Sequence, residues 1–572
     1  MGEQITGTTS VGGEFKVVKP TPIPTIWLIL LTLAFTLFQI SWSFRYYRLR
    51  AEPGYDDIFY IGDATARLNA FDHQSILSWF YDLVVRSQPH SPYSSFIAFL
   101  AFALFGYNEW APYLLNGVLI FVLLMEIRRI STALPWYLQF VLLLFPLCLP
   151  LSRSAIVEFR PDFAEGLFGA VTVWRALELK FLSTTPRPVS DYLKLAGFAA
   201  LTWLSKPTFF IHTAILMGVV TFFCLVLENR GREAWIRSLK IVGSLGLGLL
   251  IVLPYFLASW RSYWSYFQYN TGKGSLAEVW KVPGGLIGSL KYFLSGLSAE
   301  GGSSAGAMLG PFLGAFGLIA LIGIAWMIVR KDLRRMIFYG SVACGAAASF
   351  AVVVYGRMAG PCFGLTFQIL FVLMTVFVLV ALLVSTPLKG IVACLLTAPI
   401  WIFAAGQPPA WGMLLAPSRV WAGQDNAVGQ RLQDSERNDS VPINERFYAA
   451  IIENLRSQPV EKNRSPIINV CLVGDIIAET QKFYADRDQR SFAFKEFVLT
   501  DDPEAVKREL SKGDFVELAD LDSSVREMRN IPIAKIEDDL IKNLSTDPKY
   551  RLIERFQLIK GYAYLFRKVD SH

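Results

Sequence analysis

Charged residues and histidines are scarce in this chain. Asp, Glu, Lys and Arg make up 18% of the 572 residues, against about 25% in soluble domains. Only four histidines are present, which excludes a His-rich metal site but not a carboxylate-bound Mg²⁺ or Mn²⁺. The six cysteines form neither a disulfide framework nor a zinc spacing. P-loop and Rossmann glycine signatures are missing as well, so the sequence does not indicate a nucleotide-dependent enzyme.

The positive net charge of +7 does not predict a nucleic-acid-binding protein. Lys and Arg are scattered over short loops and lack the one-face clustering of a surface that follows phosphates. Their distribution instead fits the orientation of a protein in a membrane. We therefore expect membrane lipids as neighbours and no nucleic acid.

Long apolar runs are what the chain has in abundance, and hydrophobic residues make up 53% of it. Such runs recur from about residue 24 to 405, and most are long enough to cross ~30 Å of hydrocarbon. They predict a polytopic α-helical membrane protein with about eleven transmembrane helices. We expect these at 24–44, 110–127, 135–150, 163–177, 194–205, 208–227, 240–259, 307–329, 336–355, 364–384 and 388–405. The first run lacks a small-residue cleavage site, which indicates a retained span rather than a signal peptide.

The loops between these runs predict which side each one faces. Loops at 126–129, 178–194, 228–240, 330–335 and 385–390 are rich in Lys and Arg, so we expect them and residues 1–23 to be cytoplasmic. Arg45, Arg48 and Arg50 oppose this orientation, but a long loop contributes less to it. The large first loop (45–109) and the loop at 260–306 are then extracytoplasmic. The apolar segment 91–106 is predicted to be an interfacial or re-entrant helix inside the first loop.

Beyond the membrane domain (24–405) the composition becomes that of a soluble domain. We expect a linker at 406–445 and a C-terminal extracytoplasmic α/β domain at 446–572. Strands are predicted at 466–475, 491–500 and 514–521, helices at 476–486 and 503–513, and a hairpin at 550–569. The turn in "LVGDIIAET" can receive an anion at a helix start, but without a glycine fingerprint we prefer a structural turn.

Unusual polar residues collect on the predicted outer side of the membrane domain. They are Asp56, Asp57, Tyr60 and His90 in the first loop, Arg160, Asp162 and Glu165 in the second, and Lys206 and Arg357 in later ones. Carboxylates at a membrane edge can deprotonate a hydroxyl, and cations there can hold a lipid phosphate. Each residue also has a structural alternative. The acids can cap helices or complement their dipoles, Asp162 can pair with Arg160, and the cations can extend to the interface from helix ends.

The order of these motifs resembles the GT-C superfamily, polytopic glycosyltransferases that use polyprenyl-phosphate sugars. The lipid A aminoarabinose transferases and protein O-mannosyltransferases are the most similar families. The resemblance rests on "DDIFY", on "HSPYSSFIAFLAFALFGYNEW" with the basic pair that ends the next span, on "RPD" and on "KPT". The family commonly has Pro-Pro where Ser91-Pro92 stands here, and Glu at the position of Asp57. These departures bear on the subfamily and the acceptor.

The resemblance implies an inverting transfer at the extracytoplasmic face, in a bacterial inner membrane. Asp56 and Asp162 would be the catalytic acids, with Asp56 as general base. Asp57, Tyr60, His90, Arg160, Lys206 and Arg357 would bind substrate, with Asp57 and His90 as candidate ligands of a divalent cation. A polyprenyl-phosphate-linked sugar would be the donor, and a glycan, lipid or protein the acceptor.

Two other functions fit the same composition. One is a transporter or flippase of lipid-linked sugars, which should place ionisable residues near mid-membrane. The other is a non-catalytic assembly protein that binds a lipid or glycan. The aromatic and glycine-rich loop at 260–306 also has two interpretations, an aromatic belt at the membrane interface or a movable lid.

Overall fold

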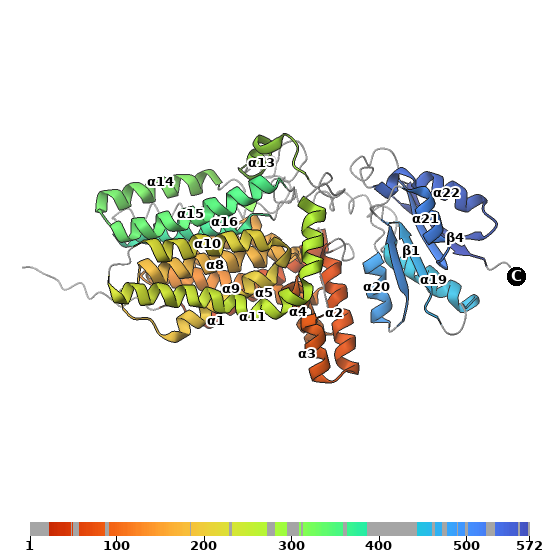
Figure 1. Cartoon of the computed structure of the whole chain (residues 1–572), viewed down its shortest axis with the longest axis horizontal. Helices are drawn as coiled ribbons and strands as arrows, with labels where there is room; N and C mark the ends of the chain where they lie inside the picture. Colours follow the sequence, from red (N-terminus) through yellow and green to blue (C-terminus); the bar gives the residue numbers. More distant parts are fainter. Residues whose placement is uncertain are drawn as a thin grey trace, which may run out of the picture.

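The computed structural model describes most of the membrane domain and most of the C-terminal domain. The described residues are 22–46, 49, 56–85, 91–183, 185–227, 231–271, 281–294, 308–309, 313–357, 363–385, 443–459, 464–471, 478–488, 490–497, 502–521, 532–558 and 561–569. They form a long bundle of helices and a smaller domain built on a sheet, which lies beyond one end of the bundle (Figure 1).

The helices of the bundle run side by side and follow the predicted apolar runs (Figure 1). They are α1 (Thr25–Tyr46), α5 (Ala111–Ile130), α6 (Trp136–Leu147), α7 (Pro150–Val157), α8 (Pro161–Phe181), α9 (Val189–Ser205), α10 (Phe210–Val226), α11 (Arg232–Thr271), α14 (Leu313–Arg330), α15 (Leu333–Gly356) and α16 (Leu365–Ser385). Helix α8 is buried along almost its whole length. It packs against α9, α16, α15 and α10, so it is the central helix of the bundle.

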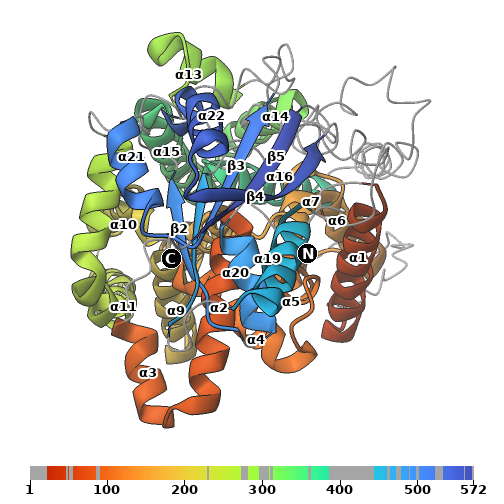
Figure 2. The ribbon, with the colours of Figure 1, turned by 90° about the vertical axis from the view of Figure 1, so that its right-hand side faces the viewer.

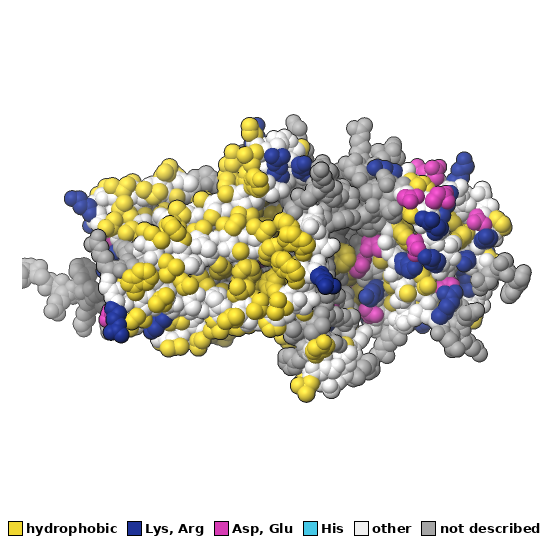
Figure 3. Space-filling model, in the orientation of Figure 1, with side chains coloured by type: hydrophobic (Ala, Val, Ile, Leu, Met, Phe, Trp, Pro, Cys, Tyr) yellow, Lys and Arg dark blue, Asp and Glu magenta, His cyan; other side chains and the backbone are white. Residues whose placement is uncertain are grey.

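Six of the described helices are long and apolar enough to cross a membrane. A seventh span results if α6 and α7, which are bent by 64° at their junction, count as one. Apolar side chains cover the visible face of the bundle, and most of the charged ones lie at its ends and on the sheet domain (Figure 3). An integral membrane protein of helical type is thereby confirmed. Ten of the eleven predicted spans overlap helices; the run 388–405 lies outside the described residues, and the count of eleven stays a prediction.

The large first loop contains three helices, α2 (Asp56–His73), α3 (Ile76–Val85) and α4 (Pro92–Phe105). Helix α4 confirms the helix predicted at 91–106. Its start is fixed by Ser91, whose hydroxyl accepts a hydrogen bond from the Ser94 N–H at 3.1 Å, and by Pro92 in the first turn. It ends at Gly106, whose φ of 71° lies in the left-handed region.

Helix α11 continues to Thr271, past residue 260 where the predicted outer loop begins. Trp260, Trp264 and Phe267 lie on one face of this extension and stack in sequence, with ring centroids 5.8 and 5.7 Å apart. Phe210 of α10 contacts both Trp260 and Phe267. The aromatic residues therefore extend a helix by packing against its neighbour, and a further helix, α13 (Gly285–Leu294), follows in the same region.

The C-terminal domain is built on a five-stranded sheet in the order β2-β1-β3-β5-β4. Its strands are β1 (Ile467–Cys471), β2 (Ala493–Phe497), β3 (Phe515–Leu521), β4 (Tyr550–Leu558) and β5 (Gly561–Lys568). Strand β1 pairs in parallel with β2 and β3, while β5 pairs antiparallel with β3 and β4. The predicted strands and hairpin are confirmed.

The helices of this domain are α19 (Ile443–Ser457), α20 (Ala478–Arg487), α21 (Pro503–Leu510) and α22 (Glu537–Thr546), together with the 3₁₀ turn η6 (Pro532–Lys535). Helix α19 begins at Ile443, within the last residues of the predicted linker (406–445). It is helical there because it is amphipathic and buries Asn444, Phe447 and Ile451. The turn in "LVGDIIAET" lies largely outside the described residues.

The two domains contact each other through the first loop. Helix α20 packs along α2, and the ring of Phe483 stacks on Phe102 of α4 with centroids 6.2 Å apart. Tyr448, Phe483 and Tyr484 of the sheet domain belong to the same hydrophobic core as the bundle. Viewed from its own side, the sheet domain lies in front of the bundle (Figure 2). It therefore rests on the end of the bundle that carries α2 and α4.

Candidate functional site

An ion pair joins the beginning of α8 to the end of α9. Asp162 lies in the first turn of α8, behind Arg160 and Pro161. Lys206 ends α9, because the following Pro207 disfavours a helical conformation at the preceding residue. Lys206 Nζ donates to Asp162 Oδ1, and the two side chains are only 13% and 7% exposed. Lys206 therefore does not extend freely into solvent, and Asp162 does not depend on Arg160 for its partner.

Two aromatic rings surround the same lysine. Its Nζ lies 4.1 Å from the ring centroid of Phe363 and 5.3 Å from that of Phe209. A cation held over aromatic faces is attracted by their quadrupoles. An ammonium group has three N–H donors, so Lys206 can keep Asp162 and still donate to a phosphate oxygen.

A second cluster of buried polar side chains surrounds Glu165, one turn further along α8. The His212 ring uses both of its nitrogens there: Nδ1 lies 2.9 Å from Glu165 Oε1, and Nε2 lies 2.8 Å from Ser349 Oγ. The Thr366 hydroxyl donates to Glu165 Oε2 at 3.3 Å. These four side chains come from α8, α10, α15 and α16, and all are buried. The network fixes four helices around the Asp162–Lys206 pair, since the His212 ring also stacks on Phe209 at 4.5 Å.

Gly166 permits this close packing of helices. A Cβ at this position would lie 2.6 Å from the Leu365 Cβ and 2.9 Å from the Leu365 carbonyl carbon. Only glycine lets α8 approach α16 closely enough for Glu165 to meet Thr366. Sequence reasoning noticed Glu165 but missed His212, Ser349 and Thr366. An ionisable residue within an apolar run, as in "FFIHTAIL", is the signal that could have found His212.

The acidic pair at the start of α2 is partly described. Asp56 is the first residue of the helix, and its side chain lies outside what the structure describes. Asp57 is fully buried, and its Oδ2 accepts a hydrogen bond from the Tyr113 hydroxyl of α5 at 2.9 Å. This contact makes Asp57 a support of the helix start as well as a candidate binding residue. Sequence reasoning did not identify Tyr113, which is far away along the chain.

Phe159 connects this acidic pair to the start of α8. Its ring meets the Tyr60 ring edge to face at 6.5 Å and the Tyr113 ring at 5.9 Å. Phe159 lies directly before Arg160 and three positions before Asp162 in the chain. The beginnings of α2 and α8, each carrying candidate acids, are therefore held close together at one end of the bundle.

The other residues predicted to bind phosphate or substrate are Arg160, Arg357 and His90. Arg160 pairs with Glu158 at 3.7 Å, and its side chain is 26% exposed. Arg357 ends α15 in a left-handed conformation with φ of 54°, and its carbonyl oxygen accepts a hydrogen bond from the Val282 N–H at 2.7 Å. The backbone thus fixes where Arg357 lies, while its role in phosphate binding stays a prediction. His90 lies outside the described residues.

The predicted metal site is not assembled by the described part of the chain. No group of three or more His, Cys, Asp or Glu side chains there is placed to hold a metal ion. Of the two candidate ligands only Asp57 is described, and Tyr113 already donates to it. A divalent cation at this site therefore stays a prediction.

This fold, a helical bundle with a small sheet domain at its end, is shared with solved structures. The solved structures that share it include ArnT from Cupriavidus metallidurans bound to undecaprenyl phosphate, with 15% identity, 95% of this chain and 98% of that chain covered, and a TM-score of 0.54. The apo form of ArnT has the same identity and coverage and a TM-score of 0.53. The Archaeoglobus fulgidus oligosaccharyltransferase has 10% identity, covers 96% of this chain and 74% of that chain, and has a TM-score of 0.48. No family model and no curated protein sequence matches the chain.

Proposed function

We propose that the protein is an inverting glycosyltransferase that moves a sugar from a polyprenyl-phosphate donor to an acceptor hydroxyl at the extracytoplasmic membrane face. The observation that supports it best is the meeting of Asp57, Phe159, Asp162 and Lys206 at the end of an ArnT-like bundle. A buried cation beside carboxylates suits a phosphate leaving group and a hydroxyl nucleophile. ArnT itself has been solved with undecaprenyl phosphate, which supports a donor of that class.

In this reaction Asp56 removes the proton from the acceptor hydroxyl. The hydroxyl oxygen then attacks the anomeric carbon from the face opposite the phosphate, and the bond from that carbon to the phosphate oxygen breaks. The electron pair leaves with the lipid phosphate, so the configuration inverts. Lys206, with Arg160 and Arg357, stabilises the departing negative charge. Asp162, the second proposed catalytic acid, holds Lys206 in place.

The geometry of the domains also fits this orientation. The candidate residues and the sheet domain lie at the same end of the bundle, which the distribution of basic loops predicts to be extracytoplasmic. The N-terminus would be cytoplasmic, and the host membrane a bacterial inner membrane. The sheet domain then covers the side from which a glycan, lipid or protein acceptor approaches.

The test is sugar transfer in membranes that contain wild type or Asp56→Asn at equal expression. Radiolabelled sugars on polyprenyl phosphate serve as donors. The matched control is Asp332→Asn, which changes an acid at the start of α15 where Asp332 accepts from the Arg335 N–H at 3.1 Å. Asn is an equally good N-cap, so this variant should keep full transfer.

Loss of transfer in Asp56→Asn alone supports the proposal and identifies the donor class. Equal transfer in both variants refutes Asp56 as general base. If wild type transfers no sugar from any donor, the transferase proposal fails. Movement of a lipid-linked sugar across proteoliposomes would then identify the alternative transporter.

A further inference from the structure

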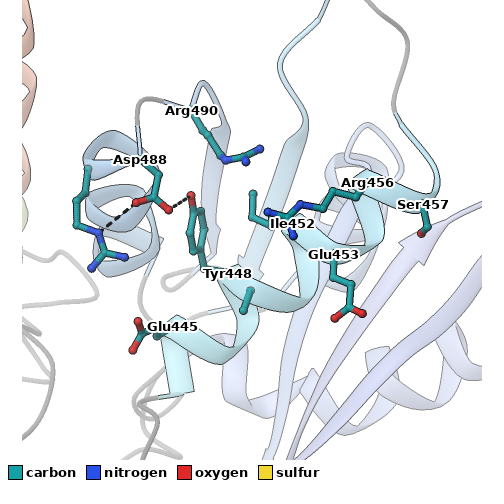
Figure 4. Close-up of a pocket in the computed structure, with 10 residues that line it drawn as sticks. Glu445, Tyr448, Ile452, Glu453, Arg456, Ser457, Asp488 and Arg490 are labelled. Atoms are coloured by element: carbon teal, nitrogen blue, oxygen red, sulfur yellow. Dashed lines mark hydrogen bonds and ion pairs between the residues drawn. The ribbon is translucent and has the colours of Figure 1, made fainter.

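A groove on the sheet domain has no role in the chemistry described above. It lies between α19 and the end of α20 and has a volume of about 790 Å³. Its lining includes Tyr448, Ile452, Arg456, Asp488 and Arg490 (Figure 4). The floor is formed by the buried Tyr448 and Ile452. This size is in the usual range of small-molecule sites.

One carboxylate of the groove already has partners. Asp488 accepts a hydrogen bond from the Tyr448 hydroxyl at 2.9 Å and one from Arg487 Nε at 3.2 Å. The Arg487 guanidinium also lies 4.9 Å from the ring centroid of Tyr484. Asp488 and Arg487 therefore largely satisfy each other, and neither determines the charge of the groove.

Two other arginines converge over the floor. Arg456 of α19 and Arg490, which follows α20, extend their guanidinium groups toward each other above Ile452 (Figure 4). The carboxylates of Glu445 and Glu453 point away from them in the same view. Neither arginine forms an ion pair with another residue that the structure describes. Two guanidinium groups that face each other repel unless an anion lies between them, and their planar forks match phosphate and carboxylate oxygens.

The groove lies where the sheet domain meets the bundle. Glu109, in the connection between α4 and α5, has its pKa raised by burial, lowered by the charge of Arg487 and raised by that of Glu445. These charges act on Glu109 only because α20 and the start of α19 lie close to the first loop. One wall of the groove, α20, packs along α2 of the first loop.

We propose that this groove binds an anionic group, a phosphate or a carboxylate, carried by a saccharide of the acceptor. Arg456 and Arg490 hold the anion, while Tyr448 and Ile452 offer an apolar floor to the sugar ring. As an acceptor subsite the groove rests on the proposed glycosyltransferase function. Its binding property is measurable without any transfer reaction.

The first experiment measures binding to the full chain in nanodiscs of phosphatidylcholine. Glucose 6-phosphate, galacturonate, glucose and inorganic phosphate are titrated by calorimetry against wild type, the double variant Arg456→Gln/Arg490→Gln and the control Arg508→Gln. Arg508 is an exposed arginine of α21, away from the groove. We expect the two anionic sugars to bind, glucose to bind at least about tenfold more weakly, and the double variant to lose about tenfold or more in affinity.

Several results would overturn the proposal. One is equal binding to wild type and the double variant, and another is equal binding of glucose and glucose 6-phosphate. If inorganic phosphate binds as tightly as glucose 6-phosphate, the groove is a free-anion site and the saccharide part is wrong. If nanodiscs with phosphatidylglycerol abolish the binding, the ligand is a lipid headgroup.

A second experiment separates this proposal from the glycosyltransferase proposal. In the transfer assay, Arg456→Gln/Arg490→Gln should raise the KM for an anionic acceptor and leave its kcat and the transfer to a neutral acceptor unchanged. A fall in kcat for both acceptors would contradict an acceptor subsite. If Asp56→Asn keeps full transfer while sugar phosphates still bind the groove, only the assignment of Asp56 fails.

Discussion

The Asp162–Lys206 pair offers the sharpest test of the site, because stability and activity should respond differently to its removal. Lys206→Met keeps an unbranched side chain that can still contact the rings of Phe209 and Phe363. It leaves the Asp162 carboxylate, only 7% exposed, without its cation. Breaking one partner of a buried pair costs about 3–5 kcal/mol. We expect Lys206→Met to lower the free energy of unfolding by that amount.

The double variant Asp162→Asn/Lys206→Met removes both charges. Replacing a whole buried pair is often close to neutral, so the double variant should unfold near the wild-type midpoint. Transfer should nevertheless fall strongly in the single and double variants alike, because the phosphate loses its buried cation and keeps only Arg160 and Arg357. Unfolding is followed by tryptophan fluorescence in denaturant, and transfer by the radiolabelled assay.

An exposed pair on the same helix is the control. Lys194 and Asp191 are 3.7 Å apart, with 66% and 25% of their side chains exposed. Lys194→Met should change stability by no more than about 1 kcal/mol. The single variant Asp162→Asn completes the cycle. The reasoning is refuted if Lys206→Met is as stable as wild type, or if the double variant is destabilised by the sum of the Asp162→Asn and Lys206→Met effects. Retained transfer in the double variant would show that Lys206 does not bind the phosphate.

Three further predictions concern packing and protonation. Gly166→Ala should lower the free energy of unfolding by about 1–3 kcal/mol, because its Cβ would collide with α16. The control Gly197→Ala, with no atom within 4 Å of its Cβ, should not destabilise the protein. Equal denaturant midpoints for the two variants would contradict the close packing of α8 against α16. His212→Ala removes one partner of the buried Glu165 and should lower the free energy of unfolding by about 1–3 kcal/mol and lower transfer. The double variant His212→Ala/Glu165→Gln should recover part of this stability; no recovery would show that the two residues act independently. Burial raises the pKa of Glu517 to about 8, so the folded domain favours the protonated carboxyl group. The contribution of this group to the free energy of unfolding is complete below about pH 4.5 and is lost as the pH rises through 8. Denaturant midpoints should therefore fall between pH 5 and 8 in wild type and fall less in Glu517→Gln, and identical slopes would contradict this pKa.

The broad architecture could be predicted because it depends on local composition. A run of apolar residues is stable in hydrocarbon only as a helix with its backbone hydrogen bonds satisfied, so the runs predicted helices wherever they are described. Alternating and β-branched segments predicted β1, β2 and β3 for a similar reason. The extension of α11 to Thr271 and the start of α19 at Ile443 were not predicted, because packing against other elements stabilises both.

In the candidate site, too, some features follow from local sequence and others depend on packing. The sequence by itself determined that Asp57, Asp162 and Lys206 are polar residues at the edges of apolar runs, where a charge is costly without a partner. Only the tertiary structure decided which partners they have: Tyr113 for Asp57, Lys206 for Asp162 and His212 for Glu165. The physical reason is the distance along the chain over which each interaction acts. The free energy of transferring a segment from water to lipid is a sum over neighbouring residues. An ion pair or hydrogen bond instead depends on contacts of a few ångströms between residues that only helix packing brings together.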